Sequence, residues 1–273
     1  MPIEYSNYCS LSLKGKTAIV TGAIGTLGKY FCSGLGEAGA NIVILDLDLA
    51  GCEQFAEVLK KKYDIQTIGL YCDVTQPESV HTMLDAVKKL FPSIDILLNN
   101  ASYRSKIPKA LHAPFEEYTL DEWIRMMAVN VNGPFLCCQA VGSLMREQQH
   151  GGSIINIASI YGMLGTDHRI YPQGENRSNN PASYSAAKGA ILSLTRYLAT
   201  YWGANGIRVN SISPGGVANK QNDEFISRYS ERVPMGRMAR PEEMVATVIY
   251  LASNASSYVT GQNLVIDGGL SAW

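Results

Sequence analysis

Short runs of apolar residues, many of them β-branched, alternate along the chain with longer segments in which apolar residues recur at helical spacing. The short runs predict strands, because a strand buried on both faces forms a near-continuous apolar stretch. The predicted strands cover residues 16–21, 41–46, 67–72, 94–99, 153–158, 207–212 and 263–266. The longer segments predict a helix that ends near residue 38 and further helices at 52–62, 77–91, 120–147, 182–201 and 241–252.

The regular alternation of strand and helix predicts an α/β protein with a doubly wound parallel sheet and helices on both faces. No Pro/Gly/Ser-rich linker and no internal repeat divides the chain, so we expect a single domain over residues 1–273. Residues 1–14 precede the first predicted strand, and we expect them to form an N-terminal extension.

Composition narrows the classes of partner. The formal net charge is −1 and Lys and Arg are spread along the chain, which argues against a nucleic-acid partner. No apolar stretch approaches the roughly 20 residues that span a bilayer, and residues 1–16 lack the pattern of a signal peptide, so we expect no membrane partner. The six cysteines, Cys9 among them, show neither a CxxC pair nor metal-ligand spacing. We therefore expect reduced cysteines, a cytoplasmic protein and no metal site.

A glycine-rich segment, TGAIGTLG at residues 21–28, follows the first predicted strand and opens a helix. Glycine allows a tight turn and a close approach to a diphosphate, and the following helix N-terminus offers N–H groups and a partial positive charge. Its place between a strand and a helix predicts a dinucleotide site. The candidate cofactor ligands in it are Gly22, Gly25, Thr26, Leu27 and Gly28.

Asp46 ends the second predicted strand, 18 residues after Gly28. A carboxylate there can accept hydrogen bonds from the adenosine ribose and would repel a 2′-phosphate, so the sequence favours NAD over NADP. The alternative interpretation is that Asp46 only caps the next helix or turn. Asp73, which ends the third strand region and precedes Val74, could receive the adenine amino group, although a capping role fits it equally well.

Tyr184 and Lys188 stand four residues apart at the start of a predicted helix, so both side chains lie on one face. A nearby ammonium favours the phenolate, and we expect Lys188 to lower the pKa of Tyr184 from about 10 towards neutral pH. Tyr184 could then exchange a proton with a substrate hydroxyl or carbonyl. Ser159 follows the fifth predicted strand and could orient the substrate oxygen, with an ordinary turn serine as the alternative. Asn130 lies inside a predicted helix, where Asn is a poor helix former, which favours a buried polar role.

Together these segments make the chain resemble the short-chain dehydrogenase/reductase family. The matching segments occur in the family's order and cover nearly the whole chain: the glycine segment, Asn99-Asn100-Ala101, Asn130, Ser159 with Tyr184 and Lys188, Pro214-Gly215-Gly216-Val217 and Asp267-Gly268-Gly269. The resemblance implies a Rossmann-like fold and hydride transfer between a nicotinamide and a secondary alcohol or carbonyl. It assigns the acid/base role to Tyr184, ribose binding and pKa lowering to Lys188, and substrate orientation to Ser159. Asn130 would hold a water molecule in a proton relay.

The same resemblance implies that Asn100 and Ala101 shape the cofactor site, and that Pro214, Gly215 and Val217 lie over the nicotinamide. Many members of the family are tetramers in which the two long helices pack across an interface. We therefore expect a homo-oligomer, a tetramer or a dimer, that acts on a small-molecule substrate.

The chain also departs from the family pattern. Thr26 replaces the middle glycine of the usual loop, and the threonine usual after Pro-Gly-Gly-Val is missing, with Asn219 as a candidate replacement. Ser159 and Tyr184 are 25 residues apart, more than in most members, and residues 163–182 form an insertion rich in charged and amide side chains.

The insertion leaves and returns beside the Ser–Tyr pair, so we expect it to form part of the substrate wall. Arg169 and Arg177 in the insertion, and Arg104 in the polar loop after the fourth predicted strand, are candidate substrate ligands. Such side chains suit a hydroxylated or anionic substrate, such as a sugar, better than a steroid or an acyl chain. The alternative is that both segments are solvated surface loops.

Two other functions stay open beside an NAD(H)-dependent oxidoreductase. Nucleotide-sugar epimerases and dehydratases share the Tyr-x-x-x-Lys pair and a similar glycine loop, but they usually append a substrate domain for which this chain leaves no room. A catalytically silent NAD(H)-sensing regulator would keep the fold. Such a regulator is expected to lose a catalytic residue, whereas Asn130, Ser159, Tyr184 and Lys188 are all present.

Overall fold

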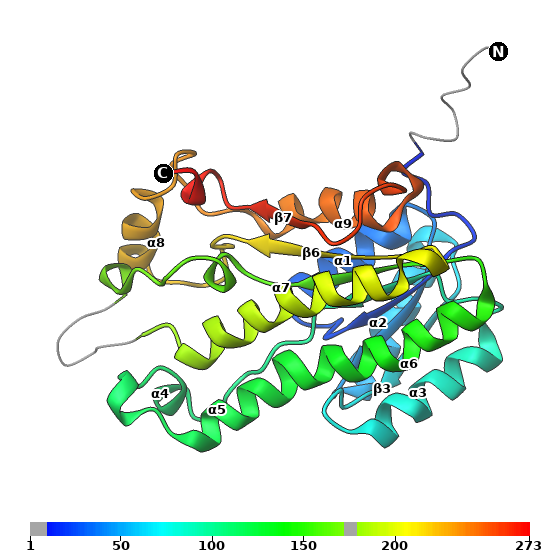
Figure 1. Cartoon of the computed structure of the whole chain (residues 1–273), viewed down its shortest axis with the longest axis horizontal. Coiled ribbons are helices and arrows are strands. Elements are labelled where there is room, and N and C mark those ends of the chain that lie inside the picture. The colour runs from blue at the N-terminus through cyan, green and yellow to red at the C-terminus, as the bar shows by residue number, and fades with distance from the viewer. Residues whose placement is uncertain (1–9, 172–178) are drawn as a thin grey trace, which may run out of the picture.

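The computed structural model describes residues 10–171 and 179–273. These residues form a seven-stranded parallel sheet in the order β3-β2-β1-β4-β5-β6-β7 (Figure 1). The strands are β1 (Thr17–Thr21), β2 (Asn41–Asp46), β3 (Thr67–Tyr71), β4 (Ile96–Asn99), β5 (Gly152–Ile157), β6 (Ile207–Pro214) and β7 (Asn263–Ile266). The predicted α/β class and the doubly wound parallel sheet are confirmed.

Helices cover both faces of this sheet. One face carries α1 (Thr26–Glu37), α2 (Leu49–Tyr63) and α9 (Val245–Ala252), and the other carries α3 (Pro77–Leu90), α6 (Gly133–Gln148) and α7 (Ala182–Trp202). The shorter α4 (Pro108–Leu111), α5 (Leu120–Met127) and α8 (Asp223–Ser230) lie at the end of the molecule where β6 ends (Figure 1). Within the described ranges, no helix combines the length and the apolar character needed to cross a membrane.

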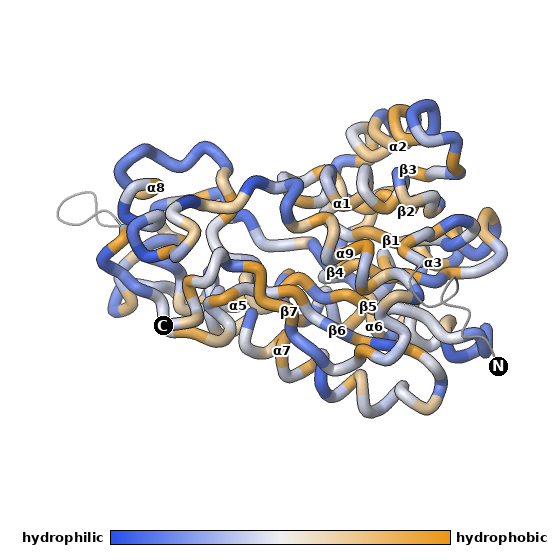
Figure 2. The backbone as a smooth tube through the Cα atoms, turned by 90° about the horizontal axis from the view of Figure 1, so that it is seen from above, coloured by the Kyte–Doolittle hydropathy of each residue, from blue (hydrophilic) through white to orange (hydrophobic). Residues whose placement is uncertain are grey.

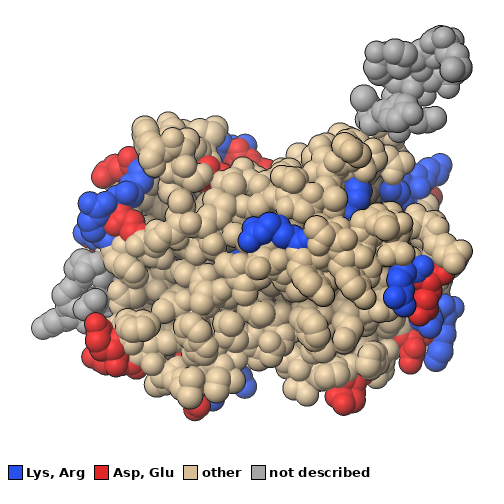
Figure 3. Space-filling model, in the orientation of Figure 1, with Lys and Arg blue, Asp and Glu red and all other residues tan. Residues whose placement is uncertain are grey.

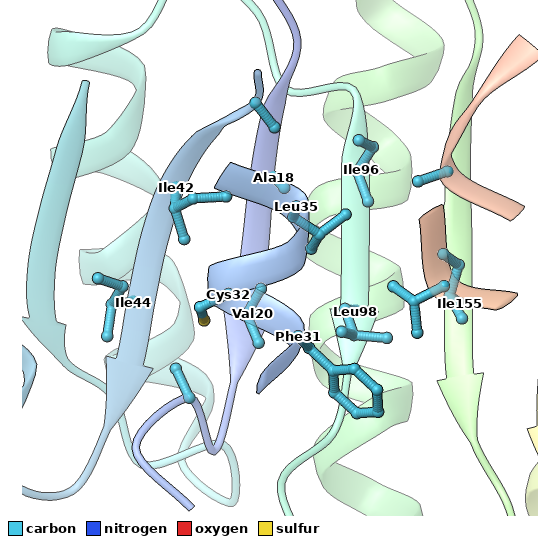
Figure 4. Packing of buried hydrophobic residues seen from close by; sticks show 14 of the residues in the cluster. Ala18, Val20, Phe31, Cys32, Leu35, Ile42, Ile44, Ile96, Leu98 and Ile155 are labelled. Atoms are coloured by element: carbon cyan, nitrogen blue, oxygen red, sulfur yellow. The ribbon is translucent and has the colours of Figure 1, made fainter. Parts of the chain in front are cut away.

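The alternation of side chains along each strand explains why the strands are apolar throughout. Ala18 and Val20 pack in the layer of α1 and α9, whereas Ile19 between them packs in the layer of α3, α6 and α7. Figure 4 shows the first layer, where Phe31 and Leu35 of α1 lie over the strands. Seen from above, hydrophobic residues concentrate along the central strands and hydrophilic ones in the peripheral loops (Figure 2).

The cysteines of the described ranges belong to this core. Cys32, Cys52, Cys72, Cys137 and Cys138 are buried and free. Burial raises the pKa of Cys138 to about 12, so its thiol keeps its proton. In the same ranges, no group of His, Cys, Asp and Glu side chains is arranged to hold a metal ion.

The prediction of one continuous helix at 120–147 is wrong. A π turn at Ala128–Asn132 separates α5 from α6. Pro134 has no N–H to donate to the carbonyl of Asn130, so the α-helical hydrogen-bond pattern cannot continue through this point. The wider turn directs the Asn130 side chain to the loop after β4, where it accepts a hydrogen bond from the Tyr103 N–H.

Two helices, α2 and α8, also differ from the prediction. α2 begins at Leu49 rather than at residue 52, because the Asp48 carboxylate caps it by accepting a hydrogen bond from the Gly51 N–H (3.0 Å). α8 is absent from the predicted elements. It has only 8 residues, too few for a helical period to be read, and Asn222 caps it.

The sheet reverses its strand order between β1 and β4. The chain runs outward from β1 to β2 and β3, and then returns to place β4 on the other side of β1. At such a switch point a crevice opens beyond the carboxyl ends of the two strands. The loops that follow β1 and β4 meet there.

Candidate active site

A cavity of about 1140 Å³ opens at this crevice. Most of the residues predicted to bind cofactor or substrate line it, namely Gly22, Gly25, Thr26, Leu27, Asp46, Asp73, Val74, Asn100, Ala101, Arg104, Ser159, Tyr184, Lys188, Pro214, Gly215 and Val217. Gly28, Asn130 and Arg169 do not line it, and Arg177 lies outside the described residues. The fold thus brings the glycine segment and the Ser–Tyr–Lys group into one space.

The glycine segment packs backbone to backbone against the loop after β4. Gly22 has a φ of +61°, and a Cβ there would lie 2.7 Å from the Cα of Ala101. A Cβ on Gly28 would lie 2.2 Å from the carbonyl oxygen of Gly22. Gly28 therefore allows α1 to pack onto the segment, which is why it does not line the cavity.

Thr21 and Asn100 bind these two loops together. The Thr21 hydroxyl oxygen accepts hydrogen bonds from the N–H groups of Asn100 (3.0 Å) and Ala101 (3.1 Å). In return, Nδ2 of Asn100 donates to the carbonyl oxygens of Thr21 (3.0 Å) and Gly22 (2.9 Å). Asn100 thus shapes the site through the backbone of the glycine segment. The role of Thr21 was not predicted, although its position directly before the first glycine of the segment marks it in the sequence.

The first turn of α1 suits an anion. Gly25 is its N-cap, no side chain caps it, and the turn contains no acidic residue. Its N–H groups therefore have no side-chain acceptor, and the helix dipole adds partial positive charge. With Thr26 and Leu27 of this turn lining the cavity, these residues fit the diphosphate of a dinucleotide.

Asp46 ends β2 and lines the cavity beside the glycine segment. Its carboxylate accepts hydrogen bonds from the N–H groups of Leu47 (2.8 Å) and Ile24 (3.4 Å). The helix-capping role considered for it belongs instead to Asp48. A carboxylate at this place fits the ribose of an adenosine.

Asp73 has a local structural role. Its Oδ1 accepts hydrogen bonds from the N–H (2.9 Å) and the hydroxyl (2.7 Å) of Thr75, which closes the turn after β3. The residue also lines the cavity, next to Val74. Binding of an adenine by Asp73 stays a prediction.

β5 and α7 bring Ser159, Tyr184 and Lys188 to one wall of the cavity. Ser159 lies two residues beyond β5, and its hydroxyl oxygen accepts a hydrogen bond from the Tyr161 N–H (3.2 Å). Tyr184 lies in the first turn of α7, with its hydroxyl hydrogen-bonded to the Ser159 side chain. Lys188 follows one turn later, and its Nζ lies 5.6 Å from the centre of the Tyr184 ring.

Lys188 is a buried cation. Its Nζ donates a hydrogen bond to the carbonyl oxygen of Ile157 (2.6 Å), the last residue of β5. Burial lowers the pKa of Lys188 to about 8, because the charged form is disfavoured away from water. The ammonium is therefore easily deprotonated for a lysine, although it remains mostly charged at pH 7.

Contrary to the expectation from the sequence, the pKa of Tyr184 does not fall towards neutral pH. Burial raises the pKa of Tyr184 above its ordinary value of 10, while the hydrogen bond with Ser159 acts in the opposite direction. Desolvation of the phenolate is the larger effect. Near neutral pH Tyr184 therefore carries its proton and can donate it to an oxygen atom.

Asn130 is buried behind the cavity wall. Its Oδ1 accepts a hydrogen bond from the Tyr103 N–H (2.8 Å), and its Nδ2 lies 3.4 Å from the hydroxyl oxygen of Ser102. The predicted buried polar role thus consists of holding the loop after β4. A place for Asn130 in a proton relay stays a prediction.

The insertion is tied down by an acidic residue that the sequence analysis did not single out. Asp167 accepts hydrogen bonds from the N–H (3.0 Å) and the Nε (2.8 Å) of Arg169, and it also pairs with Arg232. The bond with Arg169 is the main reason why the pKa of Asp167 falls to about 2. The Arg169 side chain is itself 80% exposed, so it lies on the surface rather than in the substrate wall.

In the described part of the insertion, the aromatic side chain of Tyr171 lies near Tyr184. Tyr171 is hydrogen-bonded to Tyr161, and its ring lies 5.4 Å from that of Phe225 in α8. The hydroxyl of Tyr229, also in α8, accepts a hydrogen bond from the Gly216 N–H. Phe225 and Tyr229 are one helical turn apart in α8. Their contacts with the segments at Tyr171 and Gly216 join distant parts of the chain, so no periodicity could have identified them.

Known proteins resemble this chain over nearly its whole length. A family model described as enoyl-(acyl carrier protein) reductase matches residues 22–271. The D-threitol dehydrogenase of Mycolicibacterium smegmatis is 36% identical over 262 residues, which cover 94% of this chain and 93% of that protein. The NAD-dependent glycerol dehydrogenase of Listeria innocua is 34% identical over 263 residues, which cover 94% of each.

Solved structures show the same likeness. A gluconate 5-dehydrogenase from Burkholderia cenocepacia, crystallised in complex with NADP and tartrate, matches with a TM-score of 0.86 at 30% identity. The match covers 97% of this chain and 98% of that one.

The low pKa of Lys188 makes the stability of the protein depend on pH. Between the folded pKa of about 8 and the unfolded value of 10.5, the unfolded chain holds a proton that the folded protein lacks, so raising the pH stabilises the fold. Lys188→Met removes this contribution. We expect its free energy of unfolding, relative to wild type, to fall by about 2 kcal/mol from pH 7 to pH 9.5 in urea titrations. The exposed Lys88→Met is the control, and a pH-independent difference for Lys188→Met would contradict the prediction.

Proposed function

Because the chain belongs to the short-chain dehydrogenase/reductase family and is an oxidoreductase of alcohol or carbonyl groups, we propose that it interconverts a secondary alcohol and a ketone of a polar, sugar-like substrate. We propose NAD(H) as its cofactor and the cytoplasm as its location. The buried, unpaired cysteines of the described ranges support a reducing compartment.

One observation carries this proposal. The Tyr184 hydroxyl is hydrogen-bonded to Ser159 at the wall of the same cavity that the first turn of α1 borders. A proton donor and an anion-binding helix end thus share one space. An enzyme that transfers a hydride and a proton between a dinucleotide and a small molecule needs this combination.

When bound, the nicotinamide supplies or accepts the hydride. In the direction of reduction, Tyr184 gives its phenolic proton to the carbonyl oxygen as that carbon gains the hydride; in oxidation, the Tyr184 oxygen takes the proton of the hydroxyl. Ser159 orients the substrate oxygen by a hydrogen bond. Lys188, one turn along α7, stabilises the phenolate that forms when the proton leaves.

The lining of the cavity supports a hydroxylated or anionic substrate. Lys106 and Arg125 line it together with Ser102 and Tyr103. The related enzymes named above act, by their names, on threitol, glycerol and gluconate, which are polyols and a sugar acid. Both observations favour a substrate of this class over the acyl substrate in the description of the matching family model.

Asp46 supports NAD over NADP. The relatives include an NAD-dependent enzyme and one crystallised with NADP, so the choice rests on this chain's own residues. The Asp46 carboxylate would repel a 2′-phosphate. Leu47 and Ile24, whose N–H groups it holds, supply no cation to offset that repulsion.

Loss of the phenolic hydroxyl tests the proposed chemistry. We expect the wild-type protein to reduce NAD⁺ with at least one of D-threitol, glycerol and gluconate, followed by the absorbance of NADH. Tyr184→Phe should lower kcat by about 10² to 10⁴-fold, because general acid–base catalysis is lost. It should change the Kd for NADH less than about twofold, since the phenol is not needed for the dinucleotide to bind. Tyr30→Phe, an exposed tyrosine of α1, is the control; full turnover by Tyr184→Phe would refute the assignment.

Removal of the Asp46 carboxylate tests the cofactor. We expect Asp46→Ala to raise the Kd for NADH about tenfold, because hydrogen bonds to a charged group are lost, and to lower the Kd for NADPH. The matched control is Asp48→Ala, which removes the cap of α2 two residues away and should leave the ratio of the two Kd values unchanged. Equal NADH affinity in Asp46→Ala and wild type, by titration calorimetry, would overturn the assignment.

We further propose that two copies of the chain pack through α6 and α7. Phe135, Tyr197 and Tyr201 on these helices are 48%, 63% and 58% exposed, and the two tyrosine rings stack at 6.0 Å. Apart from one Lys/Arg group, the middle of the face on which α6 and α7 run carries few charged atoms (Figure 3). An aromatic surface with few charges is typical of a protein interface.

The molar mass in solution tests this interface. We expect light scattering after size-exclusion chromatography to give a dimer or a tetramer for the wild type. The double substitution Tyr197→Glu and Tyr201→Glu should lower the molar mass to half of the wild-type value or less, because the interface would have to bury carboxylates. Val58→Glu, on the exposed side of α2, should leave the mass unchanged. A monomeric wild type at assay concentration would rule the interface out.

A further inference from the structure

Two loops reach across the cavity to the first residue of α1. Nη2 of Arg104, in the loop after β4, lies 3.5 Å from Oγ1 of Thr26. Nδ2 of Asn219, in the loop after β6, donates to the same oxygen at 3.2 Å. All three residues line the cavity, and Thr26 begins the helix whose first turn suits an anion.

We propose that Arg104 is a ligand of the cofactor diphosphate rather than of the substrate, and that Thr26 and Asn219 position it. The inference rests on the proposed function, and it moves Arg104 from the substrate side, where the sequence placed it, to the dinucleotide. Arg104 is exposed, and across residues 10–171 and 179–273 no carboxylate forms an ion pair with it. Its charge is therefore available to an anion in the cavity.

The contact between Arg104 and Thr26 is weak enough to be exchanged. A separation of 3.5 Å is at the outer limit of a hydrogen bond, and the acceptor is a neutral hydroxyl. Guanidinium–phosphate hydrogen bonds are charge-assisted, about twice as strong as neutral ones, and frequently bidentate. Arg104 therefore gains when a phosphate at the same helix end replaces the hydroxyl as its partner.

The loop that bears Arg104 is fixed on both sides of it. Before it, Tyr103 donates from its N–H to Asn130 (2.8 Å) and from its hydroxyl to Glu122 (3.1 Å). After it, the Ser105 hydroxyl donates to Glu122 (3.2 Å), a carboxylate that is only 2% exposed. These anchors restrict the backbone at Arg104, and the contact with Thr26 places its guanidinium beside the first turn of α1.

Thr26 and Asn219 are two departures from the family pattern that prove to be in contact. A glycine at position 26, as is usual in the family, would offer no side-chain acceptor to either loop. Asn219 lies in the segment where the usual threonine is missing, and its amide is turned to the Thr26 hydroxyl. The two departures therefore act together: the hydroxyl at position 26 is the shared hydrogen-bond acceptor for the loops after β4 and β6.

Nucleotide binding to the full-length protein tests this assignment. We expect Arg104→Gln to raise the Kd for NADH and for ADP about tenfold, and to leave the Kd for adenosine within twofold, because adenosine has no diphosphate. Lys109→Gln is the matched control, since it removes the same charge from an exposed position five residues along the chain that does not line the cavity. It should change none of the three Kd values more than twofold.

Substitutions of Thr26 test the positioning. Thr26→Val, which keeps the shape and loses the hydroxyl, should raise the Kd for ADP about threefold, whereas Thr26→Ser should match wild type. Thermal unfolding without nucleotide checks that all variants are folded. Unchanged ADP and NADH affinities in Arg104→Gln, with a raised KM for the sugar-like substrate, would return Arg104 to the substrate side and overturn the inference. A wild-type protein that binds neither NADH nor NADPH would instead overturn the proposed function, and the inference with it.

Discussion

The close approach of the loops after β1 and β4 is the constraint on which the rest of the site depends. Gly22 lies so near Ala101 that no side chain fits between them, and Thr21 and Asn100 exchange hydrogen bonds across the contact. Because these bonds use backbone groups of both loops, neither loop can shift without leaving polar groups unpaired. The start of α1 and the loop that carries Arg104 are thereby held at fixed positions beside the same cavity.

Burial sets the acid–base properties of the cavity wall that Ser159, Tyr184 and Lys188 form. It raises the pKa of Tyr184 above 10 and lowers that of Lys188 to about 8, so their order is the reverse of that in water. Both shifts have one cause, the cost of charge away from solvent. The proton is therefore held more firmly by the phenol than by the ammonium. The Tyr184 phenol therefore keeps its proton and can donate it to a carbonyl oxygen. Formation of the phenolate requires stabilisation by the bound reactants.

The sequence was sufficient for the strands and for the glycine segment at 21–28 because both are local patterns of neighbouring residues. The part of the cavity lining at Asn100, Ala101 and residues 214–217 was predicted only through the resemblance to the family. The interruption at Ala128–Asn132 was hidden, since its apolar residues continue a helical pattern and only Pro134 marks the break. The surface position of Arg169 could not be predicted either, because it depends on Asp167, whose own partner Arg232 lies far along the chain.

The bond between Thr21 and Asn100 also bears on the order in which the protein assembles. The two residues are 79 positions apart, so the glycine segment, although made early, reaches its native form only after β4 has been synthesised and has paired with β1. In the native sheet β5, β6 and β7 follow β4 in chain order towards one edge. Pairings of such long range are slow to form. A ribosome-bound chain that ends before residue 100 therefore lacks the partner that holds the segment in its native shape.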